Sequence, residues 1–299
     1  MTNAQDPGGD YIVRATALKG AVRAFACRTT ETCREAARMH KLSPLAAAAL
    51  GRLMSGVLML TQDLKQTEDS ITAIISGSGP LQGLTVIGEG DATVRGLVIQ
   101  PVVETSYIRP GKLDVGSAVG EGTLTIMRDM GLKEPYVGKV RLVSGEIAED
   151  LTYYLAVSEQ IPSAVSLGVQ LDRDGILYAG GMMIQLMPDA GDEVAEHLES
   201  RIGGFPEISH LMSEGFNPHQ ILDLLFGDPD IQYLGVTPCS YACHCSRDRM
   251  ERNLLTLGRE ELTGLAGDPA GINLECHFCD QQYHFDRQDI EKLLQNLAP

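Results

Sequence analysis

Four cysteines near the C-terminus have a spacing that could bind a metal ion. One residue separates Cys243 from Cys245, two residues separate Cys276 from Cys279, and thirty residues lie between the two pairs. Two such pairs can present four sulfur atoms tetrahedrally, and four thiolates suit Zn²⁺, with zinc–sulfur distances of about 2.3 Å. A Cys₄ site leaves no open position for water or substrate, so the spacing predicts a structural zinc ion and not a hydrolytic one.

The same four sulfurs could also carry redox chemistry. Four thiolates outweigh the charge of one Zn²⁺, so the sulfurs are electron-rich and oxidisable, and zinc keeps them deprotonated. Once zinc leaves, each close pair has a partner at hand. Four cysteines allow three pairings, of which Cys243–Cys245 with Cys276–Cys279 closes the smallest loops.

The other cysteines and the nearby histidines are interpreted as non-ligands. Cys239 precedes the first pair, and because a fifth ligand is not needed we interpret it as a spectator, or, less favoured, as an alternative disulfide partner. Cys27 lies at the end of a predicted strand and Cys33 on a predicted helix, where small core residues are typical. His244 and His277 sit inside the two pairs and would displace a cysteine if they bound the metal.

Composition and charge restrict which binding partners and which cellular compartment are expected for this protein. The chain has 24 Lys and Arg against 40 Asp and Glu, and this net charge of −16 argues against nucleic acid or an anionic membrane as the main partner. The N-terminus lacks the basic and apolar regions of a secretory signal. The most apolar stretch, 45–60, is too short to span a bilayer and contains Arg52, so it predicts a buried core helix. We therefore expect a cytoplasmic protein, where clustered cysteines more often bind metal or do redox work than form structural disulfides.

Residues 1–192 have the pattern of one α+β domain. Short apolar runs between glycine-rich turns indicate mostly antiparallel strands, and segments of helical periodicity indicate helices packed on them. In chain order the pattern predicts a strand over 11–26, helices over 31–40 and 44–64, a β-meander over 70–142, a helix over 147–160, and strands over 165–170 and 176–186.

Residues 193–238 form a segment of different composition. They contain one arginine and eight acidic residues, and short amphipathic pieces are interrupted by glycine and proline. Helices under about 12 residues are marginal alone in water. The pattern predicts a metastable helical linker that is ordered only while something packs on it. An ordinary helical linker is the alternative.

Residues 239–299 are predicted to form a small zinc-binding module. A structural zinc site supplies about 10–16 kcal/mol of apparent binding free energy, whereas a whole domain is stable by only about 5–15 kcal/mol. We therefore expect the module to unfold when oxidation ejects the metal, and the marginal helices upstream to follow.

No catalytic constellation accompanies these features, so we predict a protein that is not an enzyme. The glycines at Gly77 and Gly79 lack the third glycine of a nucleotide loop and sit between predicted strands. The acidic residues Glu146, Glu149 and Asp150 fall at a predicted helix start, where the helix dipole favours them.

Over nearly its full length the sequence resembles the bacterial redox-regulated heat-shock chaperones of the 33 kDa chaperonin family. The resemblance rests on the Cys-x-Cys and Cys-x-x-Cys pairs near the C-terminus, relative to which Cys239 is an extra cysteine. It also rests on the segments SPLAAAALGRLMSGVLML (43–60), GSGPLQGLTVIGEGDATVRG (77–96), EPYVGKV (134–140), GEIAEDLTYYLAVSEQIPSAVSLGV (145–169) and AGGMMIQLMP (179–188).

This resemblance implies a stress-response holdase. The reduced, zinc-bound monomer would be inactive. Oxidants such as peroxide or hypochlorite, together with unfolding stress, would release zinc and form the disulfides Cys243–Cys245 and Cys276–Cys279. The zinc module and the 193–238 linker would then unfold, the protein would dimerise, and unfolded client proteins would bind until reduction returns them to ATP-dependent chaperones.

Two other classes remain open from the residues alone. A thiol–disulfide oxidoreductase could use the Cys276-x-x-Cys279 pair, although this pair lies outside a βαβ pattern and its thiols look committed to metal. A zinc-ribbon nucleic-acid binder would need a basic module. Residues 239–299 instead contain six basic and ten acidic side chains.

Overall fold

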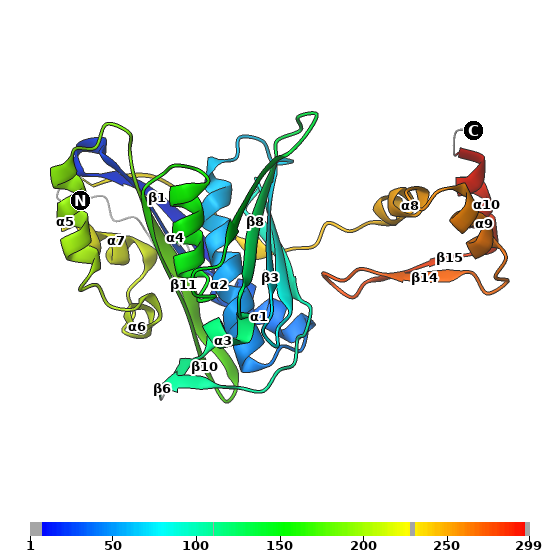
Figure 1. Ribbon diagram of the computed structural model, residues 1–299, viewed down its shortest axis with the longest axis horizontal. Coiled ribbons are helices and arrows are strands. Elements are labelled where there is room, and N and C mark those ends of the chain that lie inside the picture. The colour runs from blue at the N-terminus through cyan, green and yellow to red at the C-terminus, as the bar shows by residue number, and fades with distance from the viewer. Residues whose placement is uncertain (1–7, 110, 228–230, 297–299) are drawn as a thin grey trace. The chain divides into compact units, whose positions relative to one another are not determined.

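The computed structural model describes residues 8–109, 111–227 and 231–296 of the chain. It divides into two compact units, Met1–Ala242 and Cys243–Pro299. Both units combine helices with mainly antiparallel strands (Figure 1), so the α+β prediction is confirmed.

The first unit contains a five-stranded antiparallel sheet in the order β10-β11-β2-β1-β12. The prediction of a single strand over 11–26 is wrong, because a 3-10 turn at Leu18–Gly20 folds it into a hairpin. Lys19 and Gly20 both adopt positive φ there, and glycine takes that conformation without a steric penalty. The strands are β1 (Tyr11–Ala17), β2 (Val22–Arg28), β10 (Ser163–Asp172), β11 (Gly175–Leu186) and β12 (Gln232–Pro238).

A six-stranded sheet, in the order β13-β5-β4-β3-β8-β9, forms the second layer of this unit. It contains the predicted β-meander, which is interrupted by β6 (Tyr107–Arg109), β7 (Lys112–Leu113) and the short helix α3 (Val115–Val119). Only β13 runs parallel to its described neighbour, β5. The strands are β3 (Ser70–Gly77), β4 (Gly83–Glu89), β5 (Thr93–Val98), β8 (Gly122–Asp129), β9 (Tyr136–Arg141) and β13 (Ser240–Tyr241).

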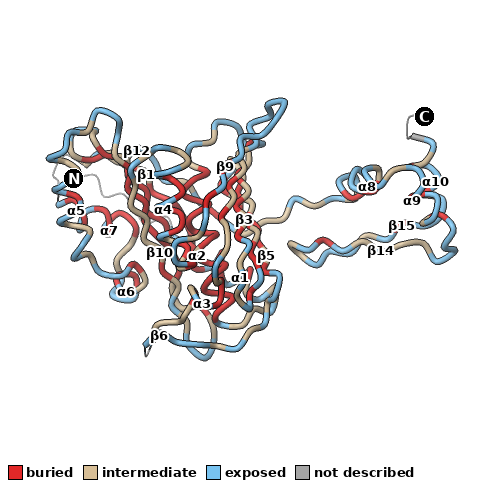
Figure 2. Tube along the Cα trace, viewed as in Figure 1, coloured by how far each residue is buried: buried red, intermediate tan, exposed pale blue. Residues whose placement is uncertain are grey.

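The core helix α2 (Pro44–Leu60) lies between the two sheets, as Figures 1 and 2 show. Every residue of α2 except Pro44 and Arg52 is buried, which confirms the predicted core helix. The stretch Pro44–Asp63 is long and apolar enough to cross a membrane, but 89% of its most apolar window is buried inside the fold. The helices α1 (Thr30–Met39) and α4 (Ala148–Val157) pack beside it.

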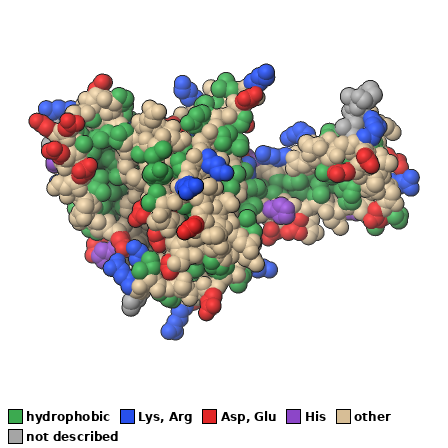
Figure 3. Space-filling view, in the orientation of Figure 1, with side chains coloured by type: hydrophobic (Ala, Val, Ile, Leu, Met, Phe, Trp, Pro, Cys, Tyr) green, Lys and Arg blue, Asp and Glu red, His purple; other side chains and the backbone are tan. Residues whose placement is uncertain are grey.

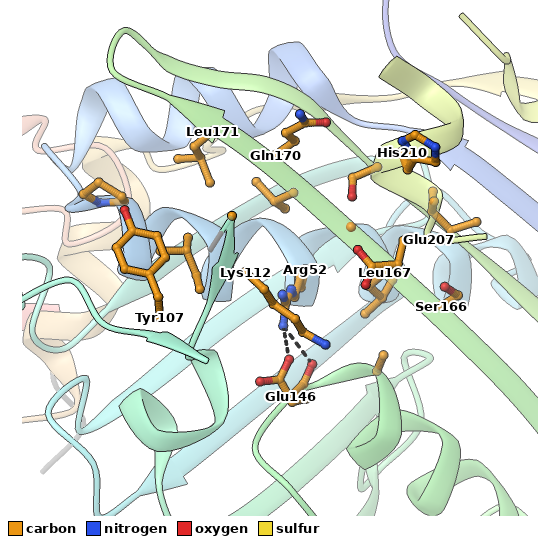
Figure 4. A pocket seen from close by; sticks show the side chains of 18 of the residues that line it. Arg52, Tyr107, Lys112, Glu146, Ser166, Leu167, Gln170, Leu171, Glu207 and His210 are labelled. Atoms are coloured by element: carbon orange, nitrogen blue, oxygen red, sulfur yellow. Dashed lines mark hydrogen bonds and ion pairs between the residues drawn. The ribbon is translucent and has the colours of Figure 1, made fainter. Parts of the chain in front are cut away.

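The Arg52 side chain of α2 reaches a pocket of about 1290 Å³ beside β10. There its guanidinium forms a 2.6 Å ion pair with Glu146 (Figure 4). This explains how a charge is tolerated in the middle of an apolar helix, because a paired charge costs far less to bury than an isolated one.

Three short helices cover the face of the five-stranded sheet that points away from α2. They are α5 (Asp192–Ile202), α6 (Ile208–Ser213) and α7 (Pro218–Phe226), and they correspond to the short amphipathic pieces predicted for 193–238. Acidic side chains gather on the outer surface of α5 (Figure 3). The strand β12, which follows them, was not predicted.

The second unit is small. It consists of α8 (Arg247–Leu255), α9 (Arg259–Ala266), a hairpin of β14 (Ile272–Glu275) and β15 (Gln282–Phe285), and α10 (Arg287–Asn296). Its core has few members among the described residues: Met250, Leu254, Leu262, Ala266, Cys276, Phe285, Ile290 and Leu293. A core of this size rarely stabilises a module alone, so an additional cross-link such as a metal is expected.

Candidate metal centre

The second unit brings the four predicted cysteines together. The Sγ atoms of Cys243, Cys245, Cys276 and Cys279 all lie within 4.8 Å of one another. Cys243 Sγ is 3.6 Å from Cys276 Sγ, and Cys245 Sγ is 3.3 Å from Cys279 Sγ. A tetrahedral ZnS₄ site with zinc–sulfur distances of about 2.3 Å has sulfur–sulfur distances of about 3.8 Å. The donor set and its spacing therefore fit a tetrahedral thiolate metal such as zinc.

The first ligand arm is positioned by the start of α8. Cys243 and Cys245 directly precede Ser246, whose side chain caps the helix by accepting a 3.2 Å hydrogen bond from the Arg249 amide. Arg247, in the first turn, pairs with Asp289 of α10 at 2.6 Å and lies 4.2 Å from the centre of the Phe285 ring. The start of α8 is thereby held against the rest of the unit.

The second ligand arm is the tight turn between β14 and β15. The Cys276 carbonyl accepts hydrogen bonds from the amides of Cys279, at 3.1 Å, and Asp280, at 2.8 Å. The Cys276 amide donates to the Gln281 carbonyl at 2.9 Å, which closes the turn. This backbone arrangement turns both sulfurs of the arm toward the first arm. It places the Cys-x-x-Cys pair in a hairpin, without the helix start that a βαβ redox motif provides.

Burial and hydrogen bonding act differently on the individual thiols. Burial raises the pKa of Cys243 to about 11 and also raises the pKa of Cys279. For Cys245, partial burial opposes ionisation, but hydrogen bonds from Tyr283 and from the neighbouring thiols outweigh it, so its pKa lies below the ordinary value. The Tyr283 phenol donates to Cys245 Sγ at 3.1 Å. Spacing did not single out this tyrosine, because no ligand motif includes it.

None of the remaining predicted positions is a member of the four-cysteine group. Cys27 and Cys33 are buried in the main core of the first unit, which confirms their interpretation as core residues. Cys239 also belongs to the first unit, and its Sγ lies 3.8 Å from the Arg28 carbonyl oxygen. His244 and His277 are exposed and are not members of the four-cysteine group.

The segment 193–238 is docked on the first unit through apolar side chains. Ile221, Leu222 and Leu225 of α7 are fully buried in a second core, which includes Tyr11 and Val13 of β1. The helices of the segment are therefore held by burial of an apolar stripe, which is the interaction that short helices need to remain ordered.

Two other contacts bring this segment close to the sheet. In β10, a Cβ at Gly168 would lie 2.7 Å from the Ser209 amide nitrogen, so only glycine lets α6 approach this closely. The strand β12 continues the docking by pairing with β1, with Tyr11 opposite Pro238.

Comparison with known proteins gives a consistent result. The model of the family described as "Hsp33 protein" matches residues 10–286. This chain belongs to the Hsp33 family. A relative named "33 kDa chaperonin" from Ruminiclostridium cellulolyticum is 49% identical over 286 residues, covering 96% of this chain and 98% of the relative. Another of the same name, from Acetivibrio thermocellus, is 46% identical, covering 95% and 97%.

A solved Hsp33 structure has the same fold. The 33 kDa chaperonin of Thermotoga maritima superposes with a TM-score of 0.85 at 38% identity and covers 96% of this chain and 98% of that one. The relatives are named chaperonins, and Hsp33 is a non-enzymatic family of chaperones. The chain is thus a chaperone-family protein and not an enzyme, in agreement with the sequence-based expectation.

Proposed function

We propose that this chain is a redox-regulated holdase. In its reduced form Cys243, Cys245, Cys276 and Cys279 hold one zinc ion, and the chain is an inactive monomer. The observation that carries the proposal is the set of four sulfurs within 4.8 Å of one another, in a separate unit with a small core, in a chain of the Hsp33 family.

Peroxide converts each cysteine pair into a disulfide. One thiolate attacks a peroxide oxygen, which gives a sulfenic acid and hydroxide, and the second thiolate then attacks that sulfur, which forms the S–S bond and releases a second hydroxide. Each disulfide uses two electrons from the cysteines and one peroxide molecule. Sulfurs in a disulfide are no longer thiolates, so the cysteines cease to hold the metal.

The proposed pairs are Cys243–Cys245 and Cys276–Cys279. In the folded unit, sulfur–sulfur contacts of 3.3 and 3.6 Å join different arms. These cross-arm contacts exist only while the unit is folded. Partners within one arm remain neighbours in the chain as the unit opens, which supports pairing within each arm.

Loss of the metal leads to client binding because the second unit unfolds. The second unit has few core residues, and a structural zinc contributes about 10–16 kcal/mol at such sites. Once it unfolds, the short helices α5 to α7 lose order and uncover the apolar face of the five-stranded sheet. Exposed apolar surface on the sheet and on the linker then binds unfolding proteins.

The proposed partners and location follow from charge and chemistry. Clients are unfolded proteins, and the oxidised chain forms a homodimer. The net charge of −16 disfavours nucleic acid and anionic membranes as partners. A cytoplasmic location would keep the cysteines reduced until oxidative stress.

Zinc and free-thiol titration before and after peroxide tests the proposal, with aggregation of a denatured client followed in parallel. We expect about one zinc per reduced chain. Peroxide with mild heat should release it, remove four thiols and create the ability to suppress aggregation. Oxidised protein that fails to suppress aggregation would contradict the proposal. Turnover in an insulin-reduction assay would favour the oxidoreductase alternative.

A further inference from the structure

Tyr283 connects the two ligand arms of the cysteine cluster. It lies on β15 opposite Leu274 of β14, in the hairpin whose turn supplies Cys276 and Cys279. Its phenol donates a 3.1 Å hydrogen bond to Cys245 Sγ, 38 residues away in the chain. The hairpin is therefore tied to the opposite arm by a contact that involves no metal.

We propose that Tyr283 is a positioning residue that restrains oxidation of Cys245 and so sets how readily oxidants release the metal. This inference rests on the redox function proposed above. A hydrogen bond to a thiolate withdraws electron density from the sulfur, and such a sulfur is a weaker nucleophile toward peroxide. Bound zinc keeps Cys245 deprotonated with or without the phenol. The hydrogen bond therefore lowers the reactivity of the Cys245 sulfur toward peroxide without increasing the fraction of Cys245 that is ionised.

The contact also favours the reduced state at equilibrium. When the Cys245 thiolate attacks peroxide, it becomes a sulfenic acid and releases hydroxide. The Cys243 thiolate then attacks it, and the resulting disulfide releases a second hydroxide. Tyr283 keeps its proton throughout. Because a neutral disulfide sulfur is a much weaker acceptor than a thiolate, the hydrogen bond is lost on oxidation.

The phenol oxygen can be removed without removing the ring. The Tyr283 ring packs at the edge of the small core of the second unit. Tyr283→Phe retains this packing and deletes only the donor. Tyr136→Phe is the matched control, because it deletes a hydroxyl on β9 of the first unit that lies 3.4 Å from the Ser158 carbonyl oxygen.

The test compares zinc release from the full-length, zinc-loaded chain and from both variants. Release is followed with a chromogenic zinc indicator, once with peroxide and once with a strong chelator and no oxidant. We expect peroxide-driven release from Tyr283→Phe to be about fivefold faster, the rate equivalent of about 1 kcal/mol for one hydrogen bond. Release from Tyr136→Phe, and release by chelator alone, should match the wild type.

Trapping of sulfenic acids with dimedone, followed by mass spectrometry of each cysteine, gives a readout that a merely structural role would not change. The labelled fraction at Cys245 should rise in Tyr283→Phe. Equal peroxide rates for wild type and Tyr283→Phe would overturn this proposal alone. The proposal would also be overturned if Tyr283→Phe accelerated zinc release by the chelator alone as much as it accelerated release by peroxide. The contact would then only stabilise the fold. Retention of zinc by the wild type under peroxide would overturn the proposed function as well.

Discussion

The sulfur atoms of Cys245 and Cys279 lie 3.3 Å apart, although the two residues are 34 positions apart in the chain. The first belongs to the segment before α8 and the second to the turn after β14. Two thiolates at this distance repel each other unless a cation lies between them. The folded second unit and metal binding are therefore expected to be interdependent.

Removal of one ligand should abolish the site and unfold its unit. Cys279→Ala leaves three sulfurs, so we expect bound zinc to fall well below one per chain and amide protection to disappear across 243–299. Cys239→Ala is the control and should keep its zinc, because Cys239 lies in the first unit. Zinc analysis and hydrogen exchange measure both. Full zinc binding by Cys279→Ala would show that the assigned ligand set is wrong.

Metal removal without oxidation should have the same structural effect. A chelator with a non-thiol reductant removes zinc while the cysteines stay reduced. Because the core of the second unit is small, we expect it to become sensitive to limited proteolysis while the two sheets of the first unit, apart from their edge strands β12 and β13, stay protected. An apo unit that remains resistant would mean that packing alone holds it.

Weaker docking of α7 should lower the oxidant and temperature threshold of activation. Leu225 is fully buried, whereas its neighbour Leu224 is 42% exposed. Leu225→Ala should destabilise the docked segment by about 2–5 kcal/mol, and Leu224→Ala should have little effect. Hydrogen exchange over 193–238 and client aggregation at graded temperatures measure the difference. Indistinguishable variants would argue that α7 stays docked in the active state.

Cys239 offers a reporter of how far the opening extends. In the docked state burial raises the pKa of its thiol, and the side chain is 8% exposed. We expect slow alkylation in the reduced chain and rapid alkylation after peroxide, once β12 leaves β1. Cys27, fully buried on β2, should stay protected throughout. Continued protection of Cys239 in an active, oxidised chain would show that β12 stays paired with β1 after activation.

Asp10 should make the first unit less stable as pH rises. Burial raises its pKa above the ordinary value of 3.8, although hydrogen bonds from Thr32 oppose this. A carboxyl with a raised folded-state pKa favours folding below its unfolded-state pKa and loses that contribution as pH rises through the folded-state value. Asp10→Asn should therefore be more stable than wild type at pH 7 and show a smaller difference near pH 4. Denaturant unfolding at both pH values measures the free energies of unfolding of the variant and the wild type. An equal difference between them at pH 4 and pH 7 would show that the folded-state pKa of Asp10 is not raised.

Much of the local structure could be predicted from residue patterns. The helix predicted over 44–64 begins at Pro44 as expected, and α5 corresponds to one of the short amphipathic pieces predicted for 193–238. The patterns failed where the signal was weak or nonlocal. The turn at Leu18–Gly20 is formed partly by non-glycine residues in positive φ. Residues 232–238 become a strand only because the edge of β1 is available for pairing.

The sequence by itself determined which thiols could bind a metal or form disulfides, because the spacing of the two cysteine pairs identifies the four candidates. It also determined that the segment before them would be acidic and built from short helices. Only the tertiary structure decided that Tyr283 contacts Cys245 and that Cys239 belongs to the first unit. Both features depend on which strands pair and on how distant segments of the chain approach each other in space. The spacing of residues along the sequence carries no information about this approach.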